Sequence, residues 1–180
     1  MSRLAHFAVI SQYRVLDVGN SSCVANRLMK IDHLNIVVKN MDASVTFYGN
    51  VLGMTKTFEA TLEGAWIETV TGLQNLSARC VFFDLSGCDV RLELLEYSKP
   101  CGEKLEENSL PNTIGLRHFA FETDDMDALI QKLQAAKVSF VSPPVTVPFP
   151  VGNRGTKRLC YFHDPDGVLL EIAEYQNSEE

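Results

Sequence analysis

Two histidines, His33 and His118, and two glutamates, Glu93 and Glu171, recur at equivalent places in the two halves of the chain. Imidazole nitrogens and carboxylate oxygens are ligands of Zn, Ni, Co, Mn and Fe ions, whose ligand preferences overlap. A lone histidine is more often a hydrogen-bonded structural residue, whereas a repeated set of two histidines and two glutamates favours a metal site. We therefore expect these four side chains to hold one divalent metal ion.

The equivalence of the four residues comes from an internal repeat. The segment 116–121 repeats the apolar and histidine pattern of 31–36 after 85 residues, and Met41-Asp42-Ala43 recurs as Met126-Asp127-Ala128 at the same offset. The segment 170–175 repeats 92–97 after 78 residues, which indicates a shorter loop inside the second copy. A period of about 80 residues with two copies predicts two fused modules rather than a solenoid.

Each copy predicts a strand, a helix and three more strands, so the expected fold class is α+β with two tandem βαβββ modules. The first copy predicts strand 31–38, helix 41–52 and strands 54–59, 78–85 and 90–97. The second predicts strand 116–122, helix 127–137 and strands 138–141, 157–163 and 168–173. We expect an N-terminal tail at 1–28, modules at 29–97 and 114–176, a linker at 98–113 and a C-terminal tail at 177–180.

Strand alternation places the candidate ligands on equivalent faces. Because side chains alternate across a sheet, Leu34 and Ile36 can pack on the helix, which leaves His33 and Asn35 on the opposite face. The same rule places Glu93, which lies between two leucines, on the face of the histidine. The second copy repeats both arrangements. An ionised carboxylate between apolar neighbours is costly unless a cation compensates it, and a shared metal ion would do so.

The composition excludes some partners. The chain of 180 residues has 16 Lys and Arg and 23 Asp and Glu, a net charge of −7, which disfavours binding to nucleic acid. No apolar run approaches the roughly 20 residues that cross a bilayer, so we expect a soluble protein without a membrane partner. We expect a cytoplasmic location, with a mitochondrial one as the alternative because residues 1–28 are poor in acids and contain arginine and serine.

The motifs around these residues resemble the vicinal oxygen chelate superfamily, which includes glyoxalase I, bleomycin resistance proteins, methylmalonyl-CoA epimerase and extradiol dioxygenases. The resemblance covers residues 30–176. It rests on Asp32-His33-Leu34, Phe47-Tyr48, Val51-Leu52-Gly53-Met54, Leu92-Glu93-Leu94, Arg117-His118-Phe119-Ala120-Phe121 and Asp164-Pro165-Asp166-Gly167 leading to Leu170-Glu171. It implies paired βαβββ modules that form a half-barrel around a divalent metal, with His33, Glu93, His118 and Glu171 as ligands.

This ligand set is most similar to that of metal-dependent glyoxalase I. The similarity implies a lyase or isomerase in which the metal stabilises an enediolate, while Glu93 or Glu171 moves a proton on a small α-hydroxycarbonyl or hemithioacetal substrate. The alternatives are an acyl-thioester epimerase, an Fe(II)-dependent dioxygenase and a non-catalytic protein that binds a small molecule. The site could be completed within a monomer or in a homodimer.

Three further residues are candidates for substrate binding. Asn35 shares the strand face of His33. Bacterial glyoxalase I enzymes tend to carry an arginine for the glutathione carboxylate four residues after the first ligand histidine, and this chain has Val37 there. Arg154 and Lys157, at the edge of the irregular stretch 143–155, are candidates to supply cations to the substrate instead. The alternative for both is an ordinary solvated charge.

Overall fold

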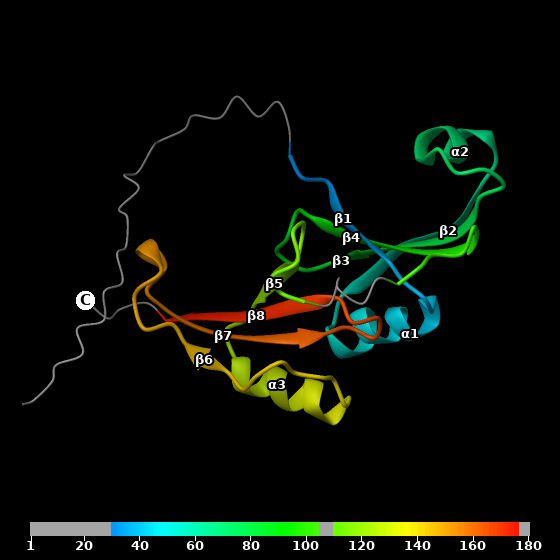
Figure 1. Ribbon diagram of the computed structural model, residues 1–180. Coiled ribbons are helices and arrows are strands. Elements are labelled where there is room, and N and C mark those ends of the chain that lie inside the picture. Colours follow the sequence, from blue (N-terminus) through cyan, green and yellow to red (C-terminus); the bar gives the residue numbers. More distant parts are fainter. Residues whose placement is uncertain (1–29, 105–109, 177–180) are drawn as a thin grey trace, which may run out of the picture.

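The computed structural model describes residues 30–104 and 110–176 (Figure 1). These residues form two four-stranded sheets with a few short helices, which confirms the predicted α+β class and the two tandem βαβββ modules. The predicted tails at 1–28 and 177–180, and residues 105–109 of the predicted linker, lie outside the described residues.

The first module contains β1 (His33–Val37), α1 (Met41–Val45), a π-helical turn (Thr46–Val51), β2 (Thr55–Glu63), α2 (Ala65–Thr71), β3 (Ser77–Asp84) and β4 (Arg91–Lys99). The second contains β5 (His118–Glu122), α3 (Met126–Ala135), β6 (Val145–Thr146), a 3-10 turn (Gly152–Arg154), β7 (Thr156–His163) and β8 (Leu169–Gln176). None of the helices in the described part of the chain has the length and apolar character needed to cross a membrane.

Both sheets have the same topology. The strand order is β1-β4-β3-β2 in the first and β5-β8-β7-β6 in the second, and in each the first two strands are parallel while the other pairs are antiparallel. Each histidine strand therefore lies beside the glutamate strand of its module. Asn35 pairs with Glu93 in the register, and Ala120 pairs with Glu171. The strands that carry the histidines, β1 and β5, are the edges of their sheets.

The first helix of each module begins with the same kind of cap. The side chain of Asn40 accepts a hydrogen bond from the Ala43 N–H at 3.0 Å, and Asp125 accepts one from the Ala128 N–H at 2.9 Å. Each cap satisfies a donor that the first helical turn leaves without an intrahelical partner. α1 continues directly into the π-helical turn, so the two together fill nearly all of the predicted helix at 41–52.

The strand predicted at 138–141 is wrong. Within this segment only an isolated bridge forms, from Phe140 to Phe162, with backbone hydrogen bonds to β7 on either side of it. The strand that pairs with β7 on the side away from β8 is β6, further along the chain. The segment follows Lys137, which has a φ of 59°, and it ends shortly before two consecutive prolines. Because proline has no N–H to donate, the chain cannot extend a ladder of sheet hydrogen bonds through this region.

Helix α2 has no counterpart among the predicted elements. It begins after Gly64 and ends at Gly72, which have φ values of 89° and 73°, in the region that favours glycine. Its Ile67 packs with Leu76 and Ala78 in a small separate cluster. Seven residues between two glycines give too short a pattern to show a helical period.

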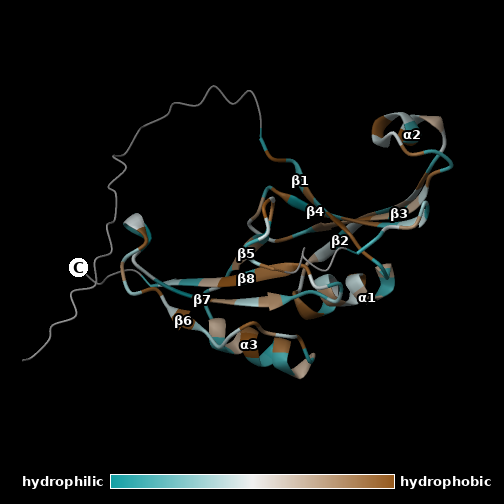
Figure 2. Ribbon diagram, viewed as in Figure 1, coloured by the Kyte–Doolittle hydropathy of each residue, from teal (hydrophilic) through white to brown (hydrophobic). Residues whose placement is uncertain are grey.

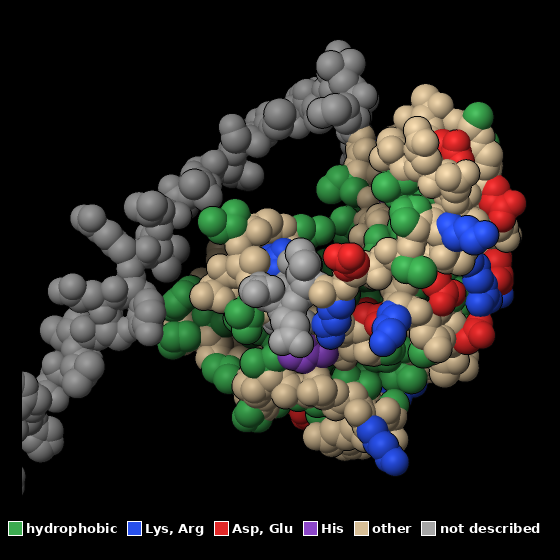
Figure 3. Space-filling model, turned by 45° about the vertical axis from the view of Figure 1, so that its right-hand side comes forward, with side chains coloured by type: hydrophobic (Ala, Val, Ile, Leu, Met, Phe, Trp, Pro, Cys, Tyr) green, Lys and Arg blue, Asp and Glu red, His purple; other side chains and the backbone are tan. Residues whose placement is uncertain are grey.

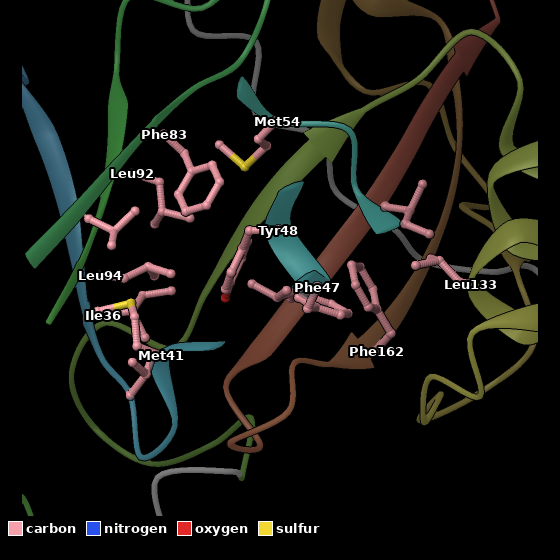
Figure 4. Packing of buried hydrophobic residues seen from close by; sticks show 14 of the residues in the cluster. Ile36, Met41, Phe47, Tyr48, Met54, Phe83, Leu92, Leu94, Leu133 and Phe162 are labelled. Carbon is pink, nitrogen blue, oxygen red and sulfur yellow. The ribbon is translucent and has the colours of Figure 1, made fainter. Parts of the chain in front are cut away.

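One hydrophobic core joins the two modules. Figure 4 shows Phe47 and Tyr48 of the π-helical turn lying between Leu94 of the first sheet and Phe162 of the second, and these residues belong to one buried cluster. The Tyr48 hydroxyl donates a hydrogen bond of 2.9 Å to Asp164 in the turn between β7 and β8. Along α3, hydrophobic and hydrophilic positions alternate (Figure 2), because one side of this helix also packs into the core.

Candidate metal centre

The first predicted ligand pair meets on neighbouring strands of the first sheet. The Nε2 atom of His33 on β1 lies 3.4 Å from the Oε2 atom of Glu93 on β4. The other ring nitrogen, Nδ1, donates to Asp32 at 2.9 Å, and Arg91 pairs with the same carboxylate. Such a contact on the far nitrogen fixes the orientation of an imidazole and directs its free nitrogen, here toward Glu93.

Two uncharged donors hold the carboxylate of Glu93. Asn35 donates its side-chain N–H to Oε2 at 2.9 Å, and the Cys80 thiol donates to Oε1 at 3.5 Å. Burial, together with the charge of Glu93, raises the pKa of the Cys80 thiol to about 12, so that it remains a donor. The structure therefore places Asn35 against the glutamate, whereas the sequence predicted a substrate contact for it.

The second predicted pair has the same core geometry but different neighbours. The Nε2 atom of His118 on β5 lies 3.2 Å from the Oε2 atom of Glu171 on β8, and the imidazole stacks obliquely near the ring of Tyr161. Glu171 is buried. Its Oε1 atom lies 2.6 Å from the Nζ atom of Lys157 on β7. Burial opposes the charge of Lys157, but the contacts with Glu171 and Tyr175 outweigh it and raise the pKa of the ammonium.

Arg154 lies near Lys157 at one end of the second sheet. Its guanidinium is 3.8 Å from the centre of the Tyr175 ring, and the Lys157 ammonium is 5.7 Å from the same ring. Arg154 also forms an ion pair with Glu122 at the end of β5. Both predicted substrate cations therefore lie beside one tyrosine, and each is paired with a glutamate. Figure 3 shows one face of the molecule on which basic and acidic side chains lie side by side, close to a histidine.

The geometry of each pair fits half of a metal coordination sphere. Two ligand atoms about 2.1 Å from a zinc-like ion lie roughly 3.0 to 3.4 Å apart when the angle at the ion is between octahedral and tetrahedral. The nitrogen to oxygen distances are 3.4 Å for His33 with Glu93 and 3.2 Å for His118 with Glu171. Each pair can thus supply one nitrogen and one oxygen to the same ion.

The structure does not bring the two pairs together into one group of four. Across residues 30–104 and 110–176, no group of three or more His, Cys, Asp or Glu side chains is placed to hold a metal ion. The reason is the shared core. Leu94 is next to Glu93 on β4, and Ile172 is next to Glu171 on β8. Both apolar side chains belong to this core, so the His–Glu pairs lie on the sheet faces turned away from it.

Sequence reasoning missed the partners of the two glutamates. Cys80 lies two residues before Phe82 on β3, and Phe82 pairs with Glu93 in the register. Strand alternation therefore places Cys80 on the same sheet face as Glu93. That signal was present, but it did not distinguish Cys80 from an ordinary buried thiol. Lys157 was identified as a cation near the site, and no sequence pattern indicated that its long side chain would reach Glu171.

Comparison with known proteins assigns the family. The sequence profile of the Glyoxalase/Bleomycin resistance protein/Dioxygenase superfamily matches residues 30–172. The chain belongs to this superfamily. Its membership confirms the resemblance inferred from the motifs, and the ligand and substrate roles of individual residues stay predictions.

Relatives within the superfamily match most of the chain. YaeR of Escherichia coli (strain K12) is 30% identical over 147 residues, which cover 82% of this chain and 97% of YaeR. Glyoxylase I 4 of Arabidopsis thaliana is 26% identical over 160 residues, covering 87% of this chain and 75% of that protein. The crystal structure of a glyoxalase family protein from Bacillus cereus has a TM-score of 0.74 at 25% identity, covering 86% of this chain and 99% of that chain.

Proposed function

We propose that this superfamily member is a divalent-metal-dependent lyase or isomerase, similar to glyoxalase I, that shifts a proton within a small α-hydroxycarbonyl or hemithioacetal substrate. The observation that carries the proposal is the duplicated pair, in which an imidazole meets a carboxylate at 3.4 Å in one module and at 3.2 Å in the other. A histidine with a purely structural role has no need of a second His–Glu pair. A metal centre with two nitrogen and two oxygen ligands needs both pairs.

The open sheet edges favour a centre shared by two copies of the chain. β1 and β5 are edge strands, and such strands pair readily with other strands. Ile31 and Leu116, each two positions before a ligand histidine, are 64% and 71% exposed. Contact between β1 of one copy and β5 of another would cover both residues and bring a first-module pair beside a second-module pair. We therefore propose a homodimer as the active form.

The chemistry divides between the ion and the side chains. A bound divalent ion supplies Lewis-acid stabilisation of negative charge on substrate oxygens. Asp32 orients the imidazole of His33 by accepting a hydrogen bond from the His33 Nδ1 atom. Asn35 holds Glu93 by donating a hydrogen bond to the Glu93 Oε2 atom. The carboxylate oxygens of Glu93 and Glu171 are suited to take a proton from one substrate carbon and to return it to the next, as general base and then acid.

The direct test is turnover by the purified full chain. Hemithioacetals of a 2-oxoaldehyde with glutathione and with smaller thiols would be assayed with Zn²⁺, Ni²⁺, Co²⁺, Mn²⁺ and Fe²⁺ in turn. We expect turnover that depends on the ion and that falls in Glu171→Gln. Glu96→Gln is the control. Glu96 is also a strand glutamate, but it lies on the face of β4 opposite to that of the predicted ligand Glu93. Full turnover in Glu171→Gln contradicts the proposal.

The same preparation distinguishes the rival activities. Consumption of dioxygen with Fe²⁺ indicates a dioxygenase, and exchange of the α proton of an acyl thioester indicates an epimerase. Tight binding of a small molecule without a metal ion and without turnover indicates a binding protein. Any of these three results, in the absence of hemithioacetal turnover, overturns the proposed reaction.

A further inference from the structure

The two ligand glutamates have unlike counter-groups, although their strands are equivalent. Glu93 pairs with Phe82 across the sheet and Glu171 pairs with Tyr161, so Ala78 and Lys157, each four residues earlier, occupy the same place. Ala78 is buried with Ile67 of α2 and Leu76, and it brings no charge to Glu93. At the equivalent place in the second module, Lys157 reaches Glu171.

The contact between Lys157 and Glu171 is dominated by charge. The Nζ and Oε1 atoms are 2.6 Å apart, and the two side chains are 17% and 4% exposed. Oε1 is shielded from solvent and has no well-directed hydrogen bond, so its negative charge is balanced mainly by the ammonium. The remaining oxygen, Oε2, is the one that faces His118.

The ammonium of Lys157 beside Glu171 disfavours the binding of a metal cation to the same carboxylate. A carboxylate that shares its charge with an ammonium attracts a metal ion less strongly, and the ammonium itself repels a divalent ion a few ångströms away in a partly buried site. The uncharged donors on Glu93, from Asn35 and Cys80, impose no such repulsion. The second pair is therefore the weaker half of the centre.

We propose that Lys157 is a built-in counter-ion of Glu171 that competes with the divalent metal and lowers the affinity of the second His–Glu pair for it. The inference rests on the proposed function, because it needs a metal to be bound at this centre. Lys157 acts through Glu171 and is thus a positioning residue. It holds the buried carboxylate in place through the 2.6 Å contact when no ion is present.

The test measures Zn²⁺ and Ni²⁺ affinity of the full chain by competition with a chelator. We expect Lys157→Gln and Lys157→Met to bind the ion about tenfold more tightly, because the repulsion is removed. Lys157→Arg keeps the charge and should bind as the wild type does. Arg158→Gln is the matched control: Arg158 is the next residue on β7, points to the other face and pairs with Asp127 and Glu174, so its affinity should not change.

Thermal unfolding supplies a second readout. Without metal, Lys157→Gln should have a lower Tm than the wild type, because Glu171 loses its counter-ion, and the rise in Tm on adding Zn²⁺ should be larger. Unchanged or weaker metal affinity in both neutral variants, with a wild type that does bind metal, overturns the role of Lys157 and leaves the proposed function intact. A wild-type chain that binds no divalent ion overturns both.

Discussion

The two halves of this molecule share a scaffold and differ around it. Each places a histidine on an edge strand, a glutamate on the parallel strand beside it and a nitrogen to oxygen contact of 3.2 to 3.4 Å between them. The surroundings are unlike: the carboxylate of the first half receives hydrogen bonds from Asn35 and Cys80, and that of the second pairs with Lys157. The two halves thus share the histidine and the glutamate and differ in the groups that contact the carboxylate.

Substitution of either glutamate tests whether both halves serve the reaction. Glu93→Gln and Glu171→Gln should each lower turnover by about 100-fold or more, because an amide can neither accept the proton nor bind the ion as a carboxylate does. Initial rates at saturating metal measure this. A loss confined to one of the two variants breaks the functional equivalence of the halves.

The next effect concerns the contact that fixes one half against the other. Tyr48→Phe removes the hydrogen bond to the buried carboxylate of Asp164, and the equivalent position in the second module is Leu133, which makes no such bond. We expect the free energy of unfolding to fall by about 1 to 3 kcal/mol, since Asp164 loses a donor. Urea unfolding measures it. Tyr161→Phe, on the open face of β7, is the control and should change stability by less than about 0.5 kcal/mol.

A smaller effect compares two equivalent arginines. Arg79 pairs with Asp42 and Glu59, and Arg158 pairs with Asp127 and Glu174. We expect Arg158→Gln to lower the free energy of unfolding by about 1 kcal/mol, because the buried Glu174 loses its ion pair and is left with the hydrogen bond from the Met126 N–H.

Arg79→Gln should cost less, since both carboxylates that it contacts are more exposed and better screened by water. Denaturant unfolding of the two variants side by side gives the comparison. An equal decrease in the free energy of unfolding of the two variants would mean that the burial of Glu174 adds nothing to the stability that Arg158 provides.

The free energy of unfolding should also depend weakly on pH through Asp164. Burial, the largest influence, raises the pKa of Asp164, although hydrogen bonds from Val168, Tyr48 and Asp166 oppose it. The folded chain therefore binds this proton more tightly than the unfolded chain, and the contribution of Asp164 to stability falls as pH rises through the raised pKa.

In the variant Asp164→Asn, the side chain at this position has no carboxyl group to take up a proton. The free energy of unfolding of the wild type minus that of this variant should therefore decrease as pH rises from the ordinary pKa range of an aspartate through the raised pKa of Asp164. Denaturant unfolding of both proteins across this range measures it. A difference that increases with pH would contradict the burial argument.

The sequence predicted what local periodicity controls. Equal offsets between His33 and His118 and between Met41 and Met126 identified the modules, because the strand and the following helix keep a fixed register. Strand alternation placed each histidine on the face of its glutamate, as the structure has it. It could not tell how the two faces are turned, because that depends on the packing of Tyr48 and Phe162 in the shared core. The contact between Lys157 and Glu171 likewise depends on the side-chain conformation of the lysine, which the periodicity of the sequence does not predict.

In the proposed homodimer, a first-module pair from one copy and a second-module pair from the other hold one ion. Two variants test it: His33→Ala with Glu93→Gln, and His118→Ala with Glu171→Gln. Each alone should bind no metal. Unfolded together in equal amounts and refolded, they should recover about a quarter of the wild-type sites, since half of the dimers are mixed and each has one intact site. Equilibrium dialysis with elemental analysis measures this recovery. A folded mixture that binds no metal contradicts a site shared between two copies.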